Sequence, residues 1–147
     1  MFLHVSRHLT GAAMDTDLAI GELAKQAGVS VETVRFYERI GLMPPPMRTK
    51  QGRRTYQSGD VRTLAFIRRA RELNFSLVDV RALLALRGPD NECADVKEIA
   101  GRHLERVRAE LRRAEEVERI LSAAVEQCCG GSTAACSVLK VLETTGV

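Results

Sequence analysis

Four cysteines lie in the last 55 residues of this 147-residue chain: Cys93, Cys128, Cys129 and Cys136. Three thiols within nine positions, beside glycines, predict metal or redox chemistry, because thiolates bind soft metals and react with oxidants. Cys128 and Cys136 bracket seven residues, enough chain to fold back and chelate one ion. We favour Cys128 over Cys129 as the loop ligand, and Cys129 either holds a second ion or stands aside.

The distribution of charge indicates a second kind of chemistry, in the other half of the chain. Residues 1–90 hold 14 Lys and Arg against 9 Asp and Glu, a net charge of +5, whereas residues 91–147 have a net charge of −2. Twelve of those 14 cations are Arg, whose planar guanidinium suits phosphate oxygens and guanine edges. The first part of the chain can therefore bind nucleic acid, and the second part need not.

Two short helices could position part of this charge. The run IGELAKQA from Ile20 predicts a helix closed by Gly28, and Ser30 is the expected N-cap of a second helix from Glu32 to Ile40. This arrangement is typical of a helix-turn-helix, although such helix pairs are also ordinary packing units. On the second helix we expect Val34 and Phe36 in the core. The expected DNA contacts here are Ser30, Thr33, Arg35 and Tyr37, with Arg39 also exposed.

A hairpin is expected after the second helix. Pro44, Pro45 and Pro46 keep the backbone extended, and residues 47–49 and 54–56 flank a polar turn at Gly52. This pattern predicts a two-stranded wing, whose basic side chains either bind DNA or form a solvated surface. The candidate contacts in the wing are Arg48, Arg53, Arg54 and Tyr56, with Lys50 beside them.

Two further helices should complete the first domain. Ser58 begins one that runs to about Leu73, and its apolar stripe should pack under the helix pair. The stripe comprises Val61, Leu64, Ala65, Ile67 and Arg68. Ser76 and Asp79 then predict a capped helix over residues 77–86, which Gly88 and Pro89 close.

A long charged helix is expected from about Asn91 to Val125. Read in heptads, two positions recur along it: Cys93, Ala100, Val107, Ala114, Leu121 and Cys128 share one, and Val96, Val117 and Ala124 share the other, interrupted by His103 and Glu110. A lone helix of about 50 Å cannot bury such a seam, so we expect a homodimer. Antiparallel pairing would bring Cys93 of one subunit near Cys128 and Cys136 of the other.

The motifs of the first domain resemble those of MerR-type transcription regulators. The resemblance is carried by TVRFYE, by GLMPPPMR, by RRTY and by RARELNFSLVDVRALL, and it extends over about residues 18–142. It implies a winged helix-turn-helix dimer bound to double-stranded promoter DNA, in a spacer too long for RNA polymerase. Effector binding then bends and untwists that DNA so that polymerase can use the promoter. By the same resemblance, Arg35, Tyr37, Arg54 and Tyr56 contact DNA.

The cysteines resemble those of the zinc- and mercury-sensing branch of the family, through Cys93, the loop CCGGSTAAC and the helix SVLKVLE. Copper(I) sensors of the family place Ser where this chain has Cys93. A third thiolate favours a divalent ion, Zn²⁺ or Hg²⁺, with Cd²⁺ or Pb²⁺ as alternatives. Zinc sensors often add a loop His, and its absence here strengthens mercury or general heavy-metal sensing. His103 is expected in the helix seam.

We therefore expect a mainly α protein: a winged helix-turn-helix DNA-binding head (residues 17–88), a long antiparallel coiled-coil dimerisation helix (89–127), and a metal-binding loop with a short C-terminal helix (128–147). Residues 1–16 are expected to be a disordered extension, with Met14 as a second plausible start. No signal peptide or membrane span is expected, which predicts a cytoplasmic protein. No catalytic set indicates an enzyme, and the alternative function is a redox- or thiol-reactive regulator of the same fold.

Overall fold

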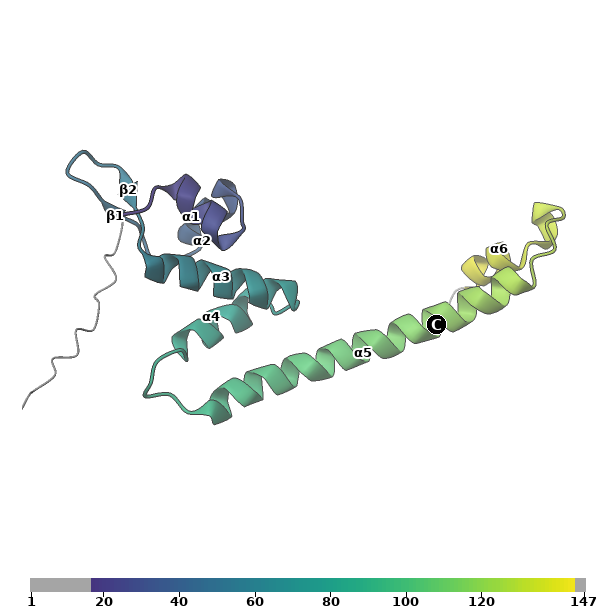
Figure 1. The fold of residues 1–147 in the computed structure, drawn as a ribbon. Coiled ribbons are helices and arrows are strands. Elements are labelled where there is room, and N and C mark those ends of the chain that lie inside the picture. Colours follow the sequence, from purple (N-terminus) through teal and green to yellow (C-terminus); the bar gives the residue numbers. More distant parts are fainter. Residues whose placement is uncertain (1–16, 145–147) are drawn as a thin grey trace, which may run out of the picture. The chain divides into compact units, whose positions relative to one another are not determined.

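The computed structural model describes residues 17–144, so the extension expected over residues 1–16 lies outside the described residues. It confirms the expected mainly helical fold (Figure 1). The contacts divide the chain into two units, and the boundary in the sequence lies between Pro89 and Asp90. The elements are, in order, α1 (Ile20–Ala27), α2 (Val31–Arg39), β1 (Met47–Arg48), β2 (Arg54–Thr55), α3 (Ser58–Glu72), α4 (Leu77–Ala85), α5 (Cys93–Glu126), the short 3₁₀ turn η1 (Thr133–Ala135) and α6 (Ser137–Glu143).

The turn between α1 and α2 forms where the sequence predicts it. Gly28 ends α1 with φ 70° and ψ 37°, a left-handed conformation that costs glycine little. Two residues later the Ser30 Oγ accepts a hydrogen bond of 3.1 Å from the backbone N–H of Thr33, which caps α2. Together these two local devices fix the helix-turn-helix.

The wing is a small antiparallel hairpin. Met47 pairs with Thr55 and Arg48 pairs with Arg54, and the turn between the strands contains Gly52 at φ 80°. A two-stranded hairpin of this length is marginal in water by itself. A bridge to Leu18 supplements it, since the backbone N–H groups of Leu18 and Tyr56 each donate to the other residue's carbonyl, at 2.8 and 3.0 Å.

The core of the first unit lies between α1, α2, α3 and α4. Its fully buried side chains include Leu23, Val34, Leu64, Ile67 and Val80. Burial of each such side chain contributes about 1.5–3 kcal/mol relative to exposure, so these contacts carry most of the stability of the head.

The stripe expected on α3 is right in part. Leu64 and Ile67 are buried, as predicted, but the Arg68 side chain is 44% exposed and Ala70 is buried instead. Arg68 lies beside Glu72, one turn along the same helix, at 3.5 Å. The short Ala70 side chain permits close helix packing, whereas a guanidinium in the core would lose its hydration.

The second unit is built around α5, an unbroken helix of 34 residues. The chain then turns through η1 and returns as α6, which packs against α5. The Ser137 Oγ at the start of α6 donates a 2.6 Å hydrogen bond to the carbonyl of Ala124, which is 3% exposed. Among the helices of residues 17–144, none combines the length and apolar composition needed to cross a bilayer.

Replacing Gly28 tests the turn that joins α1 to α2. We expect Gly28→Ala to lower the free energy of unfolding by roughly 1–2 kcal/mol, because the left-handed conformation is strained for a residue with a Cβ. Urea unfolding followed by circular dichroism measures this. Gly21→Ala is the matched control: Gly21 lies inside α1 with nothing within 4 Å of an added Cβ, so its replacement should stabilise by about 0.5–1 kcal/mol. Equal effects of the two variants would contradict the proposed role of Gly28.

Candidate functional site

The outward side of α2 offers polar and basic groups for a ligand. Ser30 and Arg35 are exposed and Thr33 is half-buried, as expected. The Ser30 Oγ lies 2.8 Å from the Thr33 Oγ1, so the two hydroxyls at the start of α2 form one local pair. Arg35 projects from the next turn of the helix. Ser30 and Thr33 thus lie together at the start of α2, whereas Arg35, two residues after Thr33, lies on a different side of the helix.

The expected orientation of the two aromatic residues of α2 is wrong. Tyr37 is 8% exposed and lies in the core, whereas Phe36 is 37% exposed and the guanidinium of Arg39 lies 5.7 Å from its ring. The reason is the helical period: residues three apart share a face, so Val34 and Tyr37 point inward together. Tyr37 thus belongs to the core that supports the helix.

The wing orients its arginines by local hydrogen bonds. The Arg48 Nη1 donates to the carbonyl of Gly52 at 2.9 Å, and the Thr49 Oγ1 accepts from the backbone N–H of Arg53 at 3.1 Å. Both bonds tighten the turn. Arg53 remains exposed and Arg54 is half-buried, so the tip and the second strand present cations as predicted.

Tyr56 differs from the expectation of a surface donor. Its side chain is 1% exposed, and its hydroxyl donates a hydrogen bond to the carboxylate of Glu38 on α2. Burial raises the pKa of Tyr56 above its ordinary value, and the hydrogen bond to Glu38 adds to that effect. The expected phosphate contact by Tyr56 is therefore replaced by an internal bond, which joins the wing to the second helix.

A cavity of about 380 Å³ lies between α2 and the wing, and we call it the basic notch. Its lining residues are Arg35, Glu38, Arg39, Pro45, Pro46 and Arg54. Three guanidinium groups and one carboxylate leave a net positive charge there. The sequence identified Arg35 and Arg54 as contacts but missed Glu38, an acidic residue in the middle of a basic helix.

The arginines of this surface differ from several others in the described chain. Within residues 17–144, Arg35, Arg53 and Arg54 form no ion pair with a carboxylate. Five arginines outside the surface have a glutamate partner within 4 Å: Arg68, Arg69, Arg102, Arg108 and Arg119. Cations that no protein carboxylate neutralises are available to anionic phosphates.

A second candidate site follows α5, where three of the cysteines meet. Cys128, Cys129 and Cys136 line one cavity of about 180 Å³, together with the glycines of the loop. Gly130 makes the turn with φ 68°, which brings Cys136 back toward the end of α5. The predicted fold-back of the loop is therefore present.

Cys136 precedes the first turn of α6, and the surroundings of its thiol favour the ionised form. The pKa of its thiol is lowered from the ordinary value, chiefly by the nearby backbone N–H of Leu139 and further by the backbone N–H of Val138 and the thiol of Cys128, while desolvation opposes this. Because only the thiolate binds metal, this lowers the cost of deprotonation on ligation. Cys128 and Cys136 thus form a pair in which one sulfur favours the ligating form.

The remaining candidates lie away from this pair. Cys93 is the exposed first residue of α5, about 50 Å from the other end by the 1.5 Å rise per residue. His103 lies on α5, is 8% exposed, and its Nδ1 is 3.4 Å from the Arg106 guanidinium. In the described part of one chain, no three Cys, His, Asp or Glu residues are grouped as a metal site.

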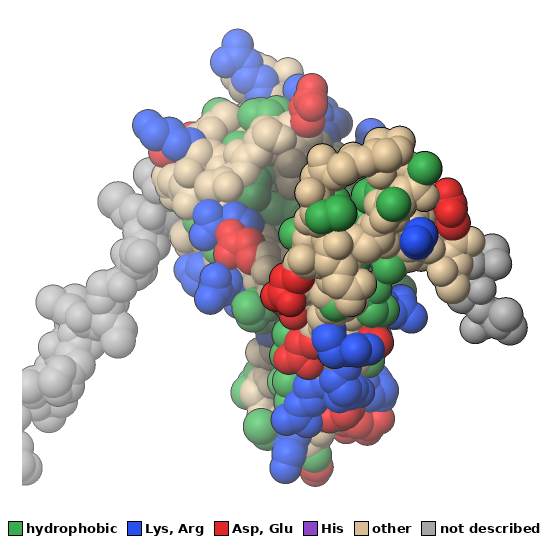
Figure 2. Space-filling model, turned by 90° about the vertical axis from the view of Figure 1, so that its right-hand side faces the viewer, with side chains coloured by type: hydrophobic (Ala, Val, Ile, Leu, Met, Phe, Trp, Pro, Cys, Tyr) green, Lys and Arg blue, Asp and Glu red, His purple; other side chains and the backbone are tan. Residues whose placement is uncertain are grey.

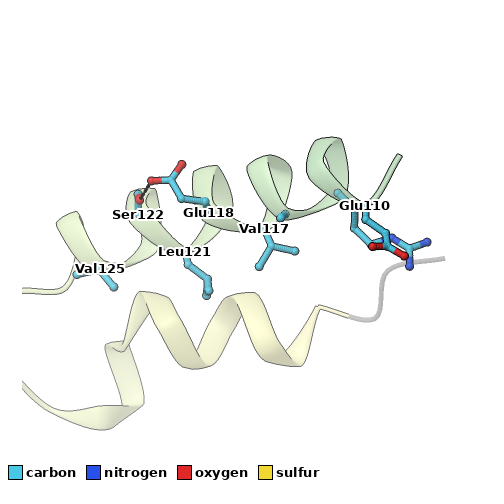
Figure 3. Close-up of a pocket in the computed structure, with 8 residues that line it drawn as sticks. Glu110, Val117, Glu118, Leu121, Ser122 and Val125 are labelled. Atoms are coloured by element: carbon cyan, nitrogen blue, oxygen red, sulfur yellow. Dashed lines mark hydrogen bonds between the residues drawn. The ribbon is translucent and has the colours of Figure 1, made fainter. Parts of the chain in front are cut away.

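An apolar groove runs along α5 and is lined by side chains of that helix, whose apolar members stay partly exposed within residues 17–144. Val117, Leu121 and Val125 project from the same side of the helix (Figure 3), and each is at least 41% exposed. The groove has a volume of about 710 Å³. Hydrophobic side chains stand among basic and acidic ones on the face drawn in Figure 2. A contiguous exposed apolar stripe marks an interaction surface.

Comparison with known proteins identifies the family. A model described as MerR HTH family regulatory protein matches residues 18–86, and a second, described as MerR, DNA binding, matches residues 61–124. The chain belongs to the MerR family. It is accordingly a DNA-binding transcription regulator rather than an enzyme, as its sequence led us to expect.

Three MerR-family relatives are similar over most of their length. The HTH-type transcriptional regulator ZntR of Escherichia coli is 40% identical over 128 residues, covering 84% of this chain and 91% of ZntR. Heavy metal-dependent transcription regulator 2 of Rhizobium meliloti is 38% identical over 122 residues, covering 82% and 83%. The crystal structure of PbrR691 from Ralstonia metallidurans in complex with lead(II) has a TM-score of 0.75 at 36% identity, covering 85% and 98%.

Replacing Arg35 tests the outward side of α2. We expect Arg35→Ala to weaken operator binding by roughly 1–3 kcal/mol, because it removes an unneutralised cation from the proposed interface. Gel-shift titration at fixed salt measures the loss. Arg102→Ala is the matched control: it removes an equal charge from α5, where Arg102 is paired with Glu98. If both variants bound as tightly as the wild type, Arg35 would lie outside the interface.

Proposed function

We propose that this MerR-family protein is a metal-responsive activator that binds a promoter spacer as a homodimer. In this proposal a divalent thiophilic ion binds cysteines at the dimer interface, and the DNA is then distorted so that RNA polymerase can use the promoter. The observation that carries the proposal is that Cys128 and Cys136 line one cavity beyond the end of α5, where the pKa of Cys136 is lowered, while Cys93 stands exposed at the other end of α5.

The apolar groove on α5 supports the homodimer. Its side chains fall at helical spacing, and a second copy of α5 would supply the matching apolar face. The ends of α5 also carry the two parts of the metal site. An antiparallel pair places the start of one helix beside the end of the other, so Cys93 of the partner subunit would approach Cys128 and Cys136.

The DNA-binding part of the proposal uses the unpaired cations of the head. Arg35, Arg53 and Arg54 would contact phosphates or base edges, assisted by Ser30 and Thr33 at the start of α2 and by Arg48 at the wing turn. Tyr37 and Tyr56 act differently in this structure, since both rings are buried and support these contacts from behind. In this proposal the interface comprises basic and hydroxyl groups at the surface, supported by the buried rings of Tyr37 and Tyr56.

Three thiolates favour a soft divalent ion, and we propose Zn²⁺, Hg²⁺, Cd²⁺ or Pb²⁺ as the inducer class. The lead(II) complex of PbrR691 supports a divalent ion in this fold. The loop of residues 128–136 contains no His, which favours heavy-metal sensing over zinc. We assign Cys128 and Cys136 as the loop ligands, and Cys129, exposed in the same cavity, as a group for a second ion.

One observation favours a second candidate, a thiol-redox regulator of the same fold. Cys128 and Cys136, which line one cavity, could form a disulfide, giving two protons and two electrons to a hydroperoxide, which is reduced to an alcohol and water. Transcription in vitro separates the two functions. A metal sensor activates when reduced protein receives an ion without oxygen, whereas a redox sensor responds only to the oxidant.

Replacing Cys93 tests the metal response. Cys93→Ser should abolish induction by divalent ions, because serine is a poor ligand for soft metals. Gel-shift affinity for the operator should stay at the wild-type value, since α5 begins beyond the DNA-binding unit. In vitro transcription with each ion in turn measures induction. Normal induction of this variant would contradict the proposal that Cys93 supplies the third thiolate.

Mixed dimers test whether the ligands come from two subunits. Cys93→Ser and Cys136→Ser subunits, joined in one dimer, should retain one intact site, whereas each variant alone should retain none. Differently tagged subunits permit purification of the mixed dimer, and its metal content is then measured after removal of excess ion. Metal-free mixed dimers would show that Cys93 does not complement Cys136 across the interface.

A further inference from the structure

The wing is attached to α2 through one side-chain bond. Tyr56 follows β2 directly, and its hydroxyl donates to the Glu38 carboxylate on α2. Within residues 17–144, this is the only hydrogen bond between Glu38 and another side chain, and Glu38 forms no ion pair. The Glu38 carboxylate therefore binds the wing through Tyr56, although three arginines line the same cavity.

The position of Arg54 depends on this attachment. Arg54 is two residues before Tyr56. Its positive charge acts to lower the pKa of the Tyr56 hydroxyl, whereas burial and Glu38 raise that pKa. The two strands of the wing contain only two residues each, so the ladder itself holds Arg54 weakly. Anchoring Tyr56 thus limits where the guanidinium of Arg54 can lie along the edge of the basic notch.

The notch has the charge and the walls that suit a single phosphate group. Arg35 and Arg39 enter it from α2 and Arg54 from the wing, which leaves a net charge of about +2 beside one carboxylate. Pro45 and Pro46 form part of the wall and offer no N–H donors, so recognition there depends on the guanidinium groups. Guanidinium groups bind phosphate oxygens in bidentate geometry.

We propose that Glu38 is a positioning residue for DNA binding, which acts through Tyr56 to hold Arg54 across the basic notch from Arg35 and Arg39, where the notch takes one backbone phosphate. The inference rests on the DNA interface proposed above and adds to it an acidic residue that does not touch DNA. Glu38 sets the separation of the wing from α2, and this separation decides whether the arginines converge on one phosphate.

The salt dependence of operator binding tests the inference, because its slope counts the phosphates that the protein neutralises. Three variants of the full-length protein are compared: Tyr56→Phe, Glu38→Ala and Glu38→Gln. Tyr56→Phe removes the hydroxyl without changing charge. The two Glu38 variants make the same charge change, but only glutamine keeps an acceptor for the Tyr56 hydroxyl.

We expect Tyr56→Phe and Glu38→Ala to reduce the slope by about 0.9 for each phosphate that the protein no longer neutralises, or about 1.8 for a dimer with two notches. Glu38→Gln should keep a slope close to that of the wild type. The double variant Tyr56→Phe/Glu38→Ala should have the same slope as either single variant, because both changes break the same bond. Urea unfolding of each variant shows whether the head is still folded at the working temperature.

Two outcomes would overturn the inference. A wild-type slope in folded Tyr56→Phe and Glu38→Ala would show that the bond does not position a phosphate-binding group, even if the overall affinity falls. Equal slopes for Glu38→Ala and Glu38→Gln would show that the hydrogen bond accepted from the Tyr56 hydroxyl at position 38 does not matter for phosphate binding. The proposed interface fails separately, if Arg35→Ala and Arg54→Ala both bind the operator with wild-type affinity and slope.

Discussion

A helix without a break keeps its two ends apart, and this constraint governs what the cysteines of the chain can do. α5 continues through Gly101 for 34 residues, with Cys93 at its first position and the other thiols beyond its last. Cys128 and Cys136 supply two sulfurs, and Cys93 of the same chain is too far along α5 to join them, so in our proposal the Cys93 sulfur comes from the partner subunit. Our proposals of a dimer and of a metal site are therefore a single proposal, and both depend on the partly exposed apolar side chains of α5, three of which are labelled in Figure 3.

The charges along α5 and those around the basic notch are arranged differently, although α3 of the head also pairs Arg68 and Arg69 with Glu72. Along α5 arginines alternate with glutamates at helical spacing and pair with them, as Arg119 does with Glu116, where the hydrogen bond lowers the pKa of the carboxyl group. Such pairs contribute little stability at an exposed surface, but they neutralise the helix. Among the described residues 17–144, no carboxylate forms an ion pair with Arg35 or Arg54 of the head. The long helix can thus approach a second copy of itself while the head attracts a polyanion.

Much of the fold could be predicted because local rules decide it. The left-handed glycine at Gly28 and the N-cap at Ser30 depend on a few neighbouring residues and are as expected. The inward face of α2 also follows a local rule, and the expectation of Phe36 in the core departs from it: Tyr37, three residues after Val34, shares its face, whereas Phe36, two residues after it, does not. The bond between Tyr56 and Glu38 joins residues 18 apart, and the donors to Cys136 are mainly backbone N–H groups. No pattern of residue types in the sequence predicts the Tyr56–Glu38 bond or the groups that surround the Cys136 sulfur.

The hydrogen bond from Ser137 to Ala124 connects the cysteine loop mechanically to α5. Cys136 is covalently joined to Ser137, so any ion that draws its sulfur inward pulls on the first turn of α6 and, through it, on the backbone of α5. Ions of different radius and preferred coordination would pull to different extents. If the loop binds metal as we propose, discrimination among ions would depend on the strain that each one transmits, and an ion could occupy the loop tightly without delivering a signal.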